Sequence, residues 1–308
     1  MTPSALLVDI DSTIPNLALM HISTWKKAQG YEVGWNIAEP TEVWASVVFD
    51  WNRHKVDGLR WMHPGADIHI GGSGYDLNAK LPDEVDRMMP DYSLYPDCDY
   101  SLGFTTRGCI RRCPFCVVPI KEGRFRVHQH PREFYNPAFK KITFLDNNIL
   151  ADPDWFQEVA DWCISKHLRV DFNQGLDLRL VTPEIADTLA ALPTHKHPRF
   201  AFDNIAYEEG VVRGLGYLDK AGFKARDKAE IYVYCDGDDD FDSALYRAKR
   251  IRELGGGLPY IMMNRHAKKT QRLIDLTRWC RPWIFWSCTW EEYLAGRGRD
   301  PTVKPYFK

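Results

Sequence analysis

The chain has 308 residues, of which 44% are hydrophobic and 13% aromatic, enough to bury a substantial core and to exclude disorder as its main state. Its 40 basic and 42 acidic side chains leave a net charge of -2, so no global field draws it to nucleic acid or to an anionic membrane. No apolar run approaches the roughly 20 residues of a membrane helix, and no export signal begins the chain, so we expect a cytoplasmic protein of two units without a membrane partner.

The first hundred residues alternate between short apolar runs and a helical segment. An amphipathic helix is expected at 17–28, and strands are expected at 5–10, 31–35, 43–49 and 66–70. This alternation is typical of a parallel sheet covered by helices, in which loops at the carboxyl ends of the strands form any ligand crevice. The sequence therefore predicts a doubly wound, Rossmann-like domain over residues 1–98. A linker is expected at 84–100, where acidic, proline and tyrosine residues gather.

A second alternation of strands and helices begins near residue 100. The predicted strands lie at 100–104, 141–146, 168–172, 199–203, 230–234 and 258–263. Between them, helices are expected at 154–167, 182–192 and 240–255. Six strand–helix units form a curved, incomplete barrel, so an α/β fold with a partial (β/α)6 barrel is predicted over residues 99–266. Residues 267–308 are expected to form a helical, aromatic extension that closes this barrel.

The eight cysteines are distributed unevenly, and three of them fall within eight residues. Cys109, Cys113 and Cys116 follow the first strand of the predicted barrel in a Cx3Cx2C spacing. In a reducing compartment, such clustering indicates a metal site rather than disulfides. A four-iron cluster normally takes four cysteinate ligands, so three ligands leave one iron open to a small molecule.

Zinc is the alternative metal for the same three cysteines. A tetrahedral zinc site needs a fourth ligand, which Cys98, His128 or His130 could provide. Under this interpretation the protein is a zinc-stabilised nucleic-acid-binding module rather than an enzyme.

The Cx3Cx2C motif after a barrel's first strand, with Phe115 just before the last cysteine, resembles the radical SAM superfamily over about residues 100–265. The resemblance implies a [4Fe-4S] cluster on the three cysteines, with S-adenosylmethionine bound at the open iron and the backbone beside Phe115 near the adenine. It also implies that one electron from the cluster cleaves the sulfonium to a 5'-deoxyadenosyl radical. The implied partners are a flavodoxin- or ferredoxin-like electron donor and a substrate that is a small molecule, a peptide or a nucleic acid.

Further cofactor contacts are implied at the ends of the later barrel strands. The second strand ends in Asp146, Asn147 and Asn148, where the superfamily has a Gly-Gly-Glu element that grips the methionyl amino group, and their oxygens can accept from an ammonium. The remaining candidates for the ribose, the carboxylate and the adenine are Gln174, Asp177, Arg179, Asp203, Asn204, Tyr234 and Gly237. A capping and salt-bridge cluster is the alternative interpretation of the group at 174–179.

A doubly wound domain before such a barrel resembles the cobalamin-binding subgroup of the superfamily. The Asp-x-His-x-x-Gly loop of that subgroup is absent, because the histidines at 21, 63 and 69 do not have its spacing. We therefore expect a degenerate cobalamin-binding-type domain without the cofactor. A cobalamin-dependent methyltransferase is the alternative.

Two further features are ambiguous. Cys280 and Cys288 lie among four tryptophans, which favours simple packing over a radical-relay role. The cysteine loop also carries six basic residues that are expected to offset the negative charge of a cluster, with steering of an anionic substrate as the alternative. These residues are Arg107, Arg111, Arg112, Lys121, Arg124 and Arg126.

Overall fold

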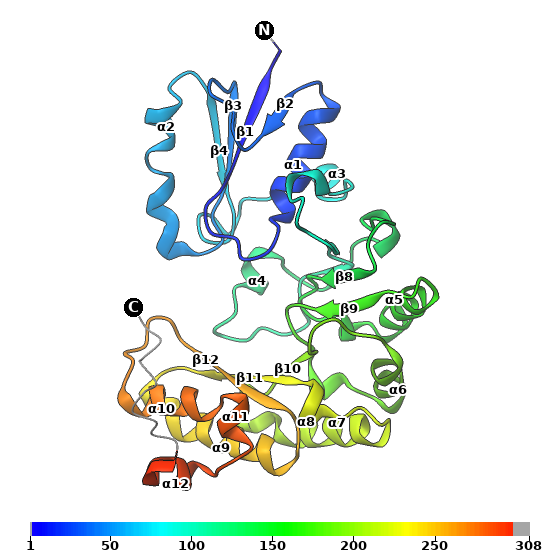
Figure 1. Ribbon diagram of the computed structural model, residues 1–308, viewed down its shortest axis with the longest axis vertical. Helices are drawn as coiled ribbons and strands as arrows, with labels where there is room; N and C mark the ends of the chain where they lie inside the picture. The colour runs from blue at the N-terminus through cyan, green and yellow to red at the C-terminus, as the bar shows by residue number, and fades with distance from the viewer. Residues whose placement is uncertain (1, 298–308) are drawn as a thin grey trace. The chain divides into compact units, whose positions relative to one another are not determined.

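The computed structural model describes residues 2–297 (Figure 1). The protein has a mixed α/β fold in which most strand pairs are parallel, as predicted. The chain forms two compact units, residues 1–147 and 148–308. The division falls later than residue 98, because Leu102 and Leu145 join the same buried cluster as the first helix.

The first unit is organised around a four-stranded parallel sheet with the order β2-β1-β3-β4. Its strands lie where the apolar runs predict them, at Ser4–Asp9 (β1), Glu32–Gly34 (β2), Glu42–Ser46 (β3) and Asp67–Gly71 (β4). The helical segments of this part are Leu17–Ala28 (α1), Asp50–Val56 (η1, a 3-10 helix), Leu59–Met62 (α2) and Asp83–Asp86 (α3).

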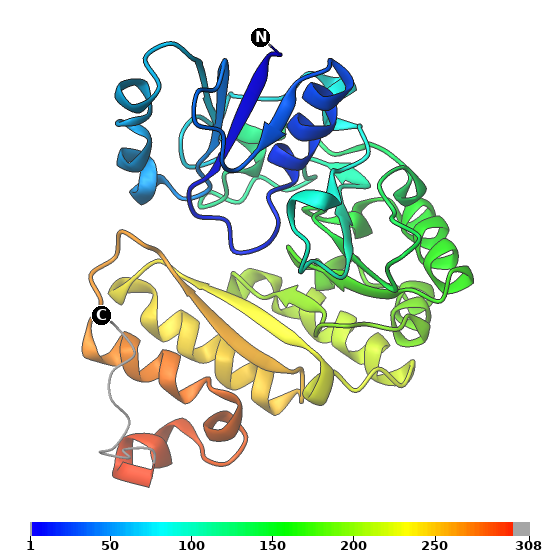
Figure 2. The ribbon, with the colours of Figure 1, turned by 45° about the horizontal axis from the view of Figure 1, so that its top comes forward.

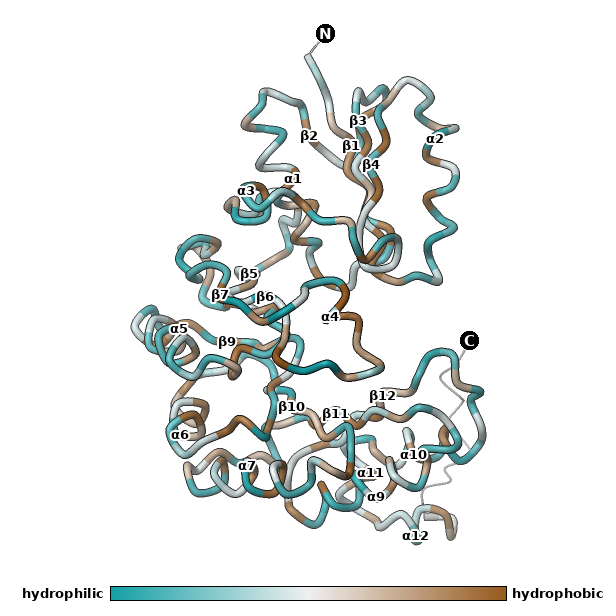
Figure 3. Tube along the Cα trace, turned by 180° about the vertical axis from the view of Figure 1, so that it is seen from behind, coloured by the Kyte–Doolittle hydropathy of each residue, from teal (hydrophilic) through white to brown (hydrophobic). Residues whose placement is uncertain are grey.

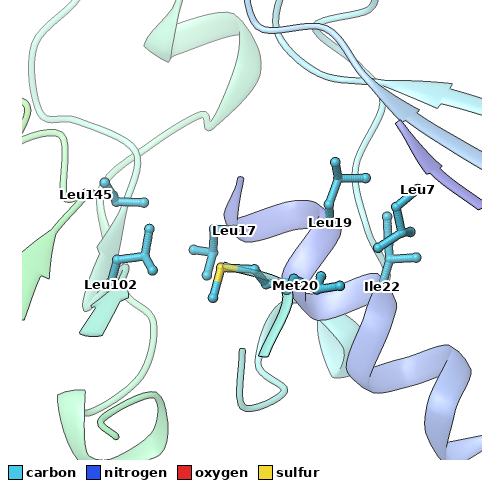
Figure 4. Close-up of a cluster of buried hydrophobic side chains, with 8 residues drawn as sticks. Leu7, Leu17, Leu19, Met20, Ile22, Leu102 and Leu145 are labelled. Carbon is cyan, nitrogen blue, oxygen red and sulfur yellow. The ribbon is translucent and has the colours of Figure 1, made fainter. Parts of the chain in front are cut away.

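Helices cover both faces of this sheet. On one face, Leu7 of β1 packs with Leu19, Met20 and Ile22 of α1 (Figure 4). The neighbouring side chain of β1, Leu6, points to the opposite face, because successive strand residues alternate sides, and it packs there in a cluster that includes Val56 and Leu59. The amphipathic patterns of these segments therefore create two apolar layers around the sheet.

The first unit also contains the strands around the cysteine loop. Strand β5 (Ser101–Gly103) pairs in parallel with β8 (Lys141–Phe144), and β6 (Thr106–Arg107) pairs with β7 (Arg126–Val127) in antiparallel orientation. A short helix, α4 (Val118–Lys121), lies within the loop between β6 and β7.

The second unit contains a three-stranded parallel sheet with the order β10-β11-β12. The strands of this sheet are Arg199–Ala201 (β10), Glu230–Cys235 (β11) and Leu258–Met263 (β12). A further strand of the unit, Arg169–Phe172 (β9), lies outside this sheet. The longer helices of the unit are Pro153–Ser165 (α5), Pro183–Ala191 (α6), Glu208–Lys220 (α7) and Phe241–Glu253 (α9). Helix α9 runs along one face of β11 and β12 (Figure 2).

The C-terminal part of the second unit has a small aromatic core. It is built from α10 (Gln271–Trp279), α11 (Pro282–Phe285) and α12 (Trp290–Glu292), with Ala225–Lys228 (α8) lying earlier in the chain. Trp279 packs edge-on against Phe285 and Trp290, and its indole N–H donates to the Cys288 carbonyl. These contacts explain Trp279 and Trp290 by packing, whereas Trp283 is 69% exposed. Residues 298–308 of the predicted extension lie outside the described part. No helix within residues 2–297 is both long and apolar enough to cross a membrane.

Candidate functional site

The cysteine loop leaves the sheet through a narrow neck. Strands β6 and β7 form this neck, with Thr106 opposite Val127 and Arg107 opposite Arg126. Gly108 follows at φ +74°, and a Cβ atom there would lie 2.2 Å from the Arg124 carbonyl oxygen. Only glycine fits this close approach, so the sequence Arg-Gly-Cys directs the chain out of the neck and into the loop.

Cys109, Cys113 and Cys116 lie in this loop as half-buried cysteines. The Cys116 N–H donates to the Cys113 carbonyl at 3.0 Å, which turns the chain between the last two cysteines. The Arg111 N–H lies 3.3 Å from the Cys109 sulfur.

The side chains of this loop do not form a ready-made metal site in the described structure. Among the residues that the structure describes, no group of three or more His, Cys, Asp or Glu side chains is arranged to hold a metal ion. The three thiols share one loop and are partly exposed, so their number, type and accessibility suit a three-thiolate cluster.

Asp146 anchors the loop from the neighbouring strand. Its buried carboxylate follows β8 and accepts from the backbone N–H and hydroxyl groups of both Thr105 and Thr106. Burial raises the pKa of this carboxyl, and the threonine hydrogen bonds oppose that rise. Asp146, which the sequence proposed as a ligand of a methionyl amino group, therefore has a structural task that occupies both oxygens.

The two residues after Asp146 differ from it in their hydrogen bonding. Asn147 Nδ2 and Asn148 Oδ1 are buried, and neither atom has a hydrogen-bond partner among the described residues. A buried polar atom without a partner costs roughly 1–3 kcal/mol, which a bound ligand would relieve. Within the described residues, this end of β8 therefore retains one unused donor and one unused acceptor.

Two of the three candidates for a fourth zinc ligand are engaged elsewhere. The Cys98 thiol donates to the Tyr100 carbonyl at 3.2 Å, and burial raises its pKa. His130 Nδ1 accepts from the Arg132 N–H at 3.1 Å as a helix cap. The third candidate, His128, lies 3.4 Å from Asp86, but its buried Nε2 has no hydrogen-bond partner among the described residues.

A buried polar cluster lies behind the loop, and sequence reasoning missed it. Arg107 donates two hydrogen bonds to Asp86, at 2.5 and 2.6 Å, and stacks on the Phe104 ring. Burial and the Arg107 charge lower the pKa of His21 to about 3 and that of His128 to about 4. Both nitrogens of His21 have no hydrogen-bond partner within the described part. No local sequence motif predicts this cluster, because its members come from distant segments of the chain.

Among the cofactor contacts predicted in the second unit, the structure brings Asp177 and Arg179 together. Asp177 accepts from the Arg179 backbone N–H and pairs with its guanidinium at 2.7 and 2.8 Å, which is the capping arrangement considered from sequence. Burial raises the pKa of Asp203, and the charges of Asp177 and Arg179 also act on it. Gln174 is exposed in the preceding turn.

Tyr234 and Gly237 lie at the carboxyl end of β11. The Tyr234 N–H donates to Asp203 at 3.0 Å, and its hydroxyl donates to Asp236 at 2.9 Å. Arg247, which the sequence did not single out, is almost fully buried below them and donates to the Phe202 and Tyr234 carbonyls. Asn204 caps the following 3-10 helix through its side chain.

The loops that follow β1 and β4 of the four-stranded sheet are held by contacts within the protein. Asp11, after β1, accepts from the Val48 and Phe49 N–H groups and from Asn52. A Cβ atom at Gly72, after β4, would lie 2.2 Å from the Val47 carbonyl oxygen. Gly72 therefore serves a close contact between two loops of the sheet.

No family model matches the sequence of this chain, and a search of the curated proteins returns no significant match.

Proposed function

We propose that the protein is a radical SAM enzyme that modifies a substrate through a 5'-deoxyadenosyl radical. The observation that supports this most is the position of the Cx3Cx2C loop. It leaves the carboxyl end of β5 and is anchored by Asp146 at the carboxyl end of the parallel neighbour β8. Ligands of parallel α/β sheets bind at this edge, because the connecting loops meet there.

Cys109, Cys113 and Cys116 would hold the [4Fe-4S] cluster of such an enzyme. When bound, this group supplies the single electron that cleaves the sulfonium of S-adenosylmethionine. Gly108 and the β6–β7 neck hold the loop at the sheet edge, and Asp146 fixes its first residues. The unpartnered Asn147 amide and Asn148 carbonyl provide a donor and an acceptor for the polar end of the cofactor.

The wider architecture agrees with this proposal. The order β2-β1-β3-β4 is that of a doubly wound sheet, which places its crevice between the ends of β1 and β3. Asp11 and Gly72 contacts fill that region, and the loop after β1 has no histidine, so we propose a degenerate cobalamin-binding-type domain. The partial (β/α)6 barrel would consist of the six strands β5, β8, β9, β10, β11 and β12.

Anaerobic incubation with iron and sulfide, followed by metal analysis, tests the proposal. The expected product is a brown protein with roughly four irons per chain that releases 5'-deoxyadenosine from S-adenosylmethionine after dithionite reduction. Cys113→Ala should lose both properties. Cys98→Ala is the matched control and should keep both, since its thiol serves the Tyr100 carbonyl.

Two results would reject the proposal. The first is a colourless protein that binds one zinc and loses it in the Cys98→Ala variant as well as in Cys113→Ala. The second is a four-iron protein that releases no 5'-deoxyadenosine under reduction.

A further inference from the structure

The sheet of the second unit has one face that helices cover and one face that they leave open. Helices α9, α10 and α11 lie on the same side of β11 and β12 (Figure 3). Side chains of both strands that point to this side, such as Val233 and Ile261, are buried. Because strand residues alternate sides, the residues between them form the opposite face. We call this opposite side the open face, and it includes Glu230, Tyr232, Tyr234, Tyr260 and Met262.

The open face presents aromatic side chains to solvent. The register of the parallel pair β11–β12 places Tyr232 beside Tyr260 and Tyr234 beside Met262. The ring centroids of Tyr232 and Tyr260 are 5.7 Å apart and their planes are 66° apart, so the two rings form a corner. Tyr260 is 57% exposed and Met262 is 41% exposed. Exposed large side chains that gather in one patch mark a binding surface.

A fixed carboxylate stands at the end of this row of rings. Asp236 directly follows β11, and its Oδ1 accepts from the Tyr234 hydroxyl at 2.9 Å and from the Asn264 amide at 2.6 Å. Within the part of the chain that the structure describes, no hydrogen bond to the second oxygen, Oδ2, is found. The Tyr234 and Asn264 contacts therefore orient a carboxylate that keeps one oxygen for a ligand.

Negative charge exceeds positive charge among the residues that the register places on this face or at its carboxyl edge. Glu230, Asp203 and Asp236 are acidic, and Arg199, beside Glu230 in register, is basic. Arg199 is already paired, because it donates to the buried Asp171 at 2.7 Å and lies 3.7 Å from Glu230. The excess carboxylates would repel phosphate groups, so the face suits a positively charged ligand better than a nucleic acid.

We propose that the open face binds an organic cation, such as an amine, a guanidinium or a quaternary ammonium group, between the rings of Tyr232 and Tyr260 and the carboxylate of Asp236. The face of a tyrosine ring is negative, so it attracts a cation, and a carboxylate adds a charge-assisted hydrogen bond. Rings set at an angle to each other are the walls from which aromatic cages for alkylammonium groups are built.

The identity of this cation as the substrate, or as part of it, rests on the proposed function. In a strand–helix barrel the helices lie outside, so the open face of β11 and β12 would line the inside, and loops at the carboxyl ends of the strands would carry the reaction. Asp236 lies at that end of β11, next to Tyr234, a candidate contact of the cofactor. The substrate class inferred for the enzyme is therefore an organic cation.

Titration of the full chain with benzylamine, a cation at neutral pH, and with neutral benzyl alcohol tests the inference by ligand-detected NMR. We expect benzylamine to bind at least about fivefold more tightly, because only the cation gains from the ring faces and from Asp236. Tyr260→Leu and Asp236→Asn should each weaken benzylamine binding about two- to fivefold. Tyr260→Phe keeps the ring face, so it should bind benzylamine like the wild-type protein.

Matched controls lie elsewhere on the second unit. Tyr246→Leu removes a tyrosine of α9 that is 43% exposed, and Asp219→Asn removes an exposed carboxylate of α7. Both should change the affinity for benzylamine less than about twofold. N-acetyl-lysine methylamide is titrated alongside: tighter binding of this lysine analogue would assign the cation to a protein side chain, and tighter binding of benzylamine would assign it to a free amine.

Three results would overturn the inference. They are equal binding of benzylamine and benzyl alcohol, equal affinities of the Tyr260→Leu and Tyr246→Leu variants for benzylamine, or tighter binding of benzoate than of benzylamine. Dithionite-driven release of 5'-deoxyadenosine is measured in parallel on the wild-type protein. Release without cation binding rejects the ligand class alone, and cation binding without release rejects the proposed function alone.

Discussion

The hydroxyl of Thr106 donates to the same Asp146 oxygen that accepts from the Thr106 backbone N–H. This contact joins residues 40 positions apart in sequence and ties the entry of the cysteine loop to the end of β8. Because the acceptor is a buried carboxylate, the loop's position depends on one side chain outside it.

Asp146→Asn should loosen the loop without unfolding the protein. An asparagine amide places a donor where a carboxylate oxygen accepts, so at least one threonine donor loses its partner. We expect the free energy of unfolding in urea to fall by about 1–3 kcal/mol, with faster proteolytic cleavage between Gly108 and Arg124. Asp187→Asn, at an exposed position of α6, is the control and should change neither quantity. Unchanged stability in Asp146→Asn would contradict the anchoring role.

A pair of glycine substitutions separates backbone conformation from close contact. Gly108 and Gly123 both have positive φ, at +74° and +77°, but only at Gly108 would a Cβ atom meet a neighbouring carbonyl. Gly123→Ala should therefore cost only the conformational strain of roughly 1 kcal/mol. Gly108→Ala should cost clearly more and disrupt the β6–β7 neck. Thermal unfolding of the two variants is the measurement, and equal costs would show that the close approach to Arg124 is unimportant.

Acid should destabilise the first unit through two buried histidines. The pKa of His21 is lowered to about 3 and that of His128 to about 4 by burial and the nearby Arg107, while an unfolded histidine titrates near 6.5. The unfolded chain therefore binds more protons below pH 6.5, and stability falls as the pH drops from 6.5 toward 4. Linkage gives a loss of about 2 kcal/mol per histidine between about pH 7.5 and 5.

Variants identify the source of this pH dependence. His21→Leu should flatten the dependence of unfolding free energy on pH, because it removes one of the two titrating groups. His54→Leu, at an exposed position of η1, should leave the slope intact. Asp86 and Arg107 lie beside both histidines. If the unfolding free energy still depends on pH in a variant that lacks both His21 and His128, the dependence belongs to the ion pair between Asp86 and Arg107.

Thiol labelling of the native protein should divide the cysteines into two classes. Cys98, Cys109, Cys113 and Cys116 are partly exposed and should react with an alkylating reagent in the native protein, with Cys98 the slowest because burial raises its pKa. The buried thiols should react only after unfolding, since burial raises the pKa of Cys163 to about 12 and strongly raises that of Cys280. Mass spectrometry of the labelled peptides checks this. Fast labelling of Cys280 or Cys288 would revive a chemical role for that pair.

The sequence by itself determined the features that depend on neighbouring residues. Apolar periodicity predicted the strands other than β6 and β7, together with the helices α1, α5, α6 and α9. Each of these elements is specified by the spacing of neighbouring side chains. The trio of cysteines was visible because its members are adjacent in the chain. Helix α7 escaped prediction, since its glycines at 210, 214 and 216 weaken the helical pattern that tertiary packing restores.

Only the tertiary structure decided which side chains meet across the fold. The family resemblance implies a cofactor contact at Asp146, and the structure adds a role that the sequence does not predict: the parallel pairing of β5 with β8 lets Asp146 anchor the threonines. The Arg107, Asp86 and His21 cluster comes from three separate segments, and burial, which no short pattern encodes, lowers the pKa of its histidine. Chain spacing specifies local geometry, whereas hydrogen-bond partners and local dielectric depend on contacts between distant segments.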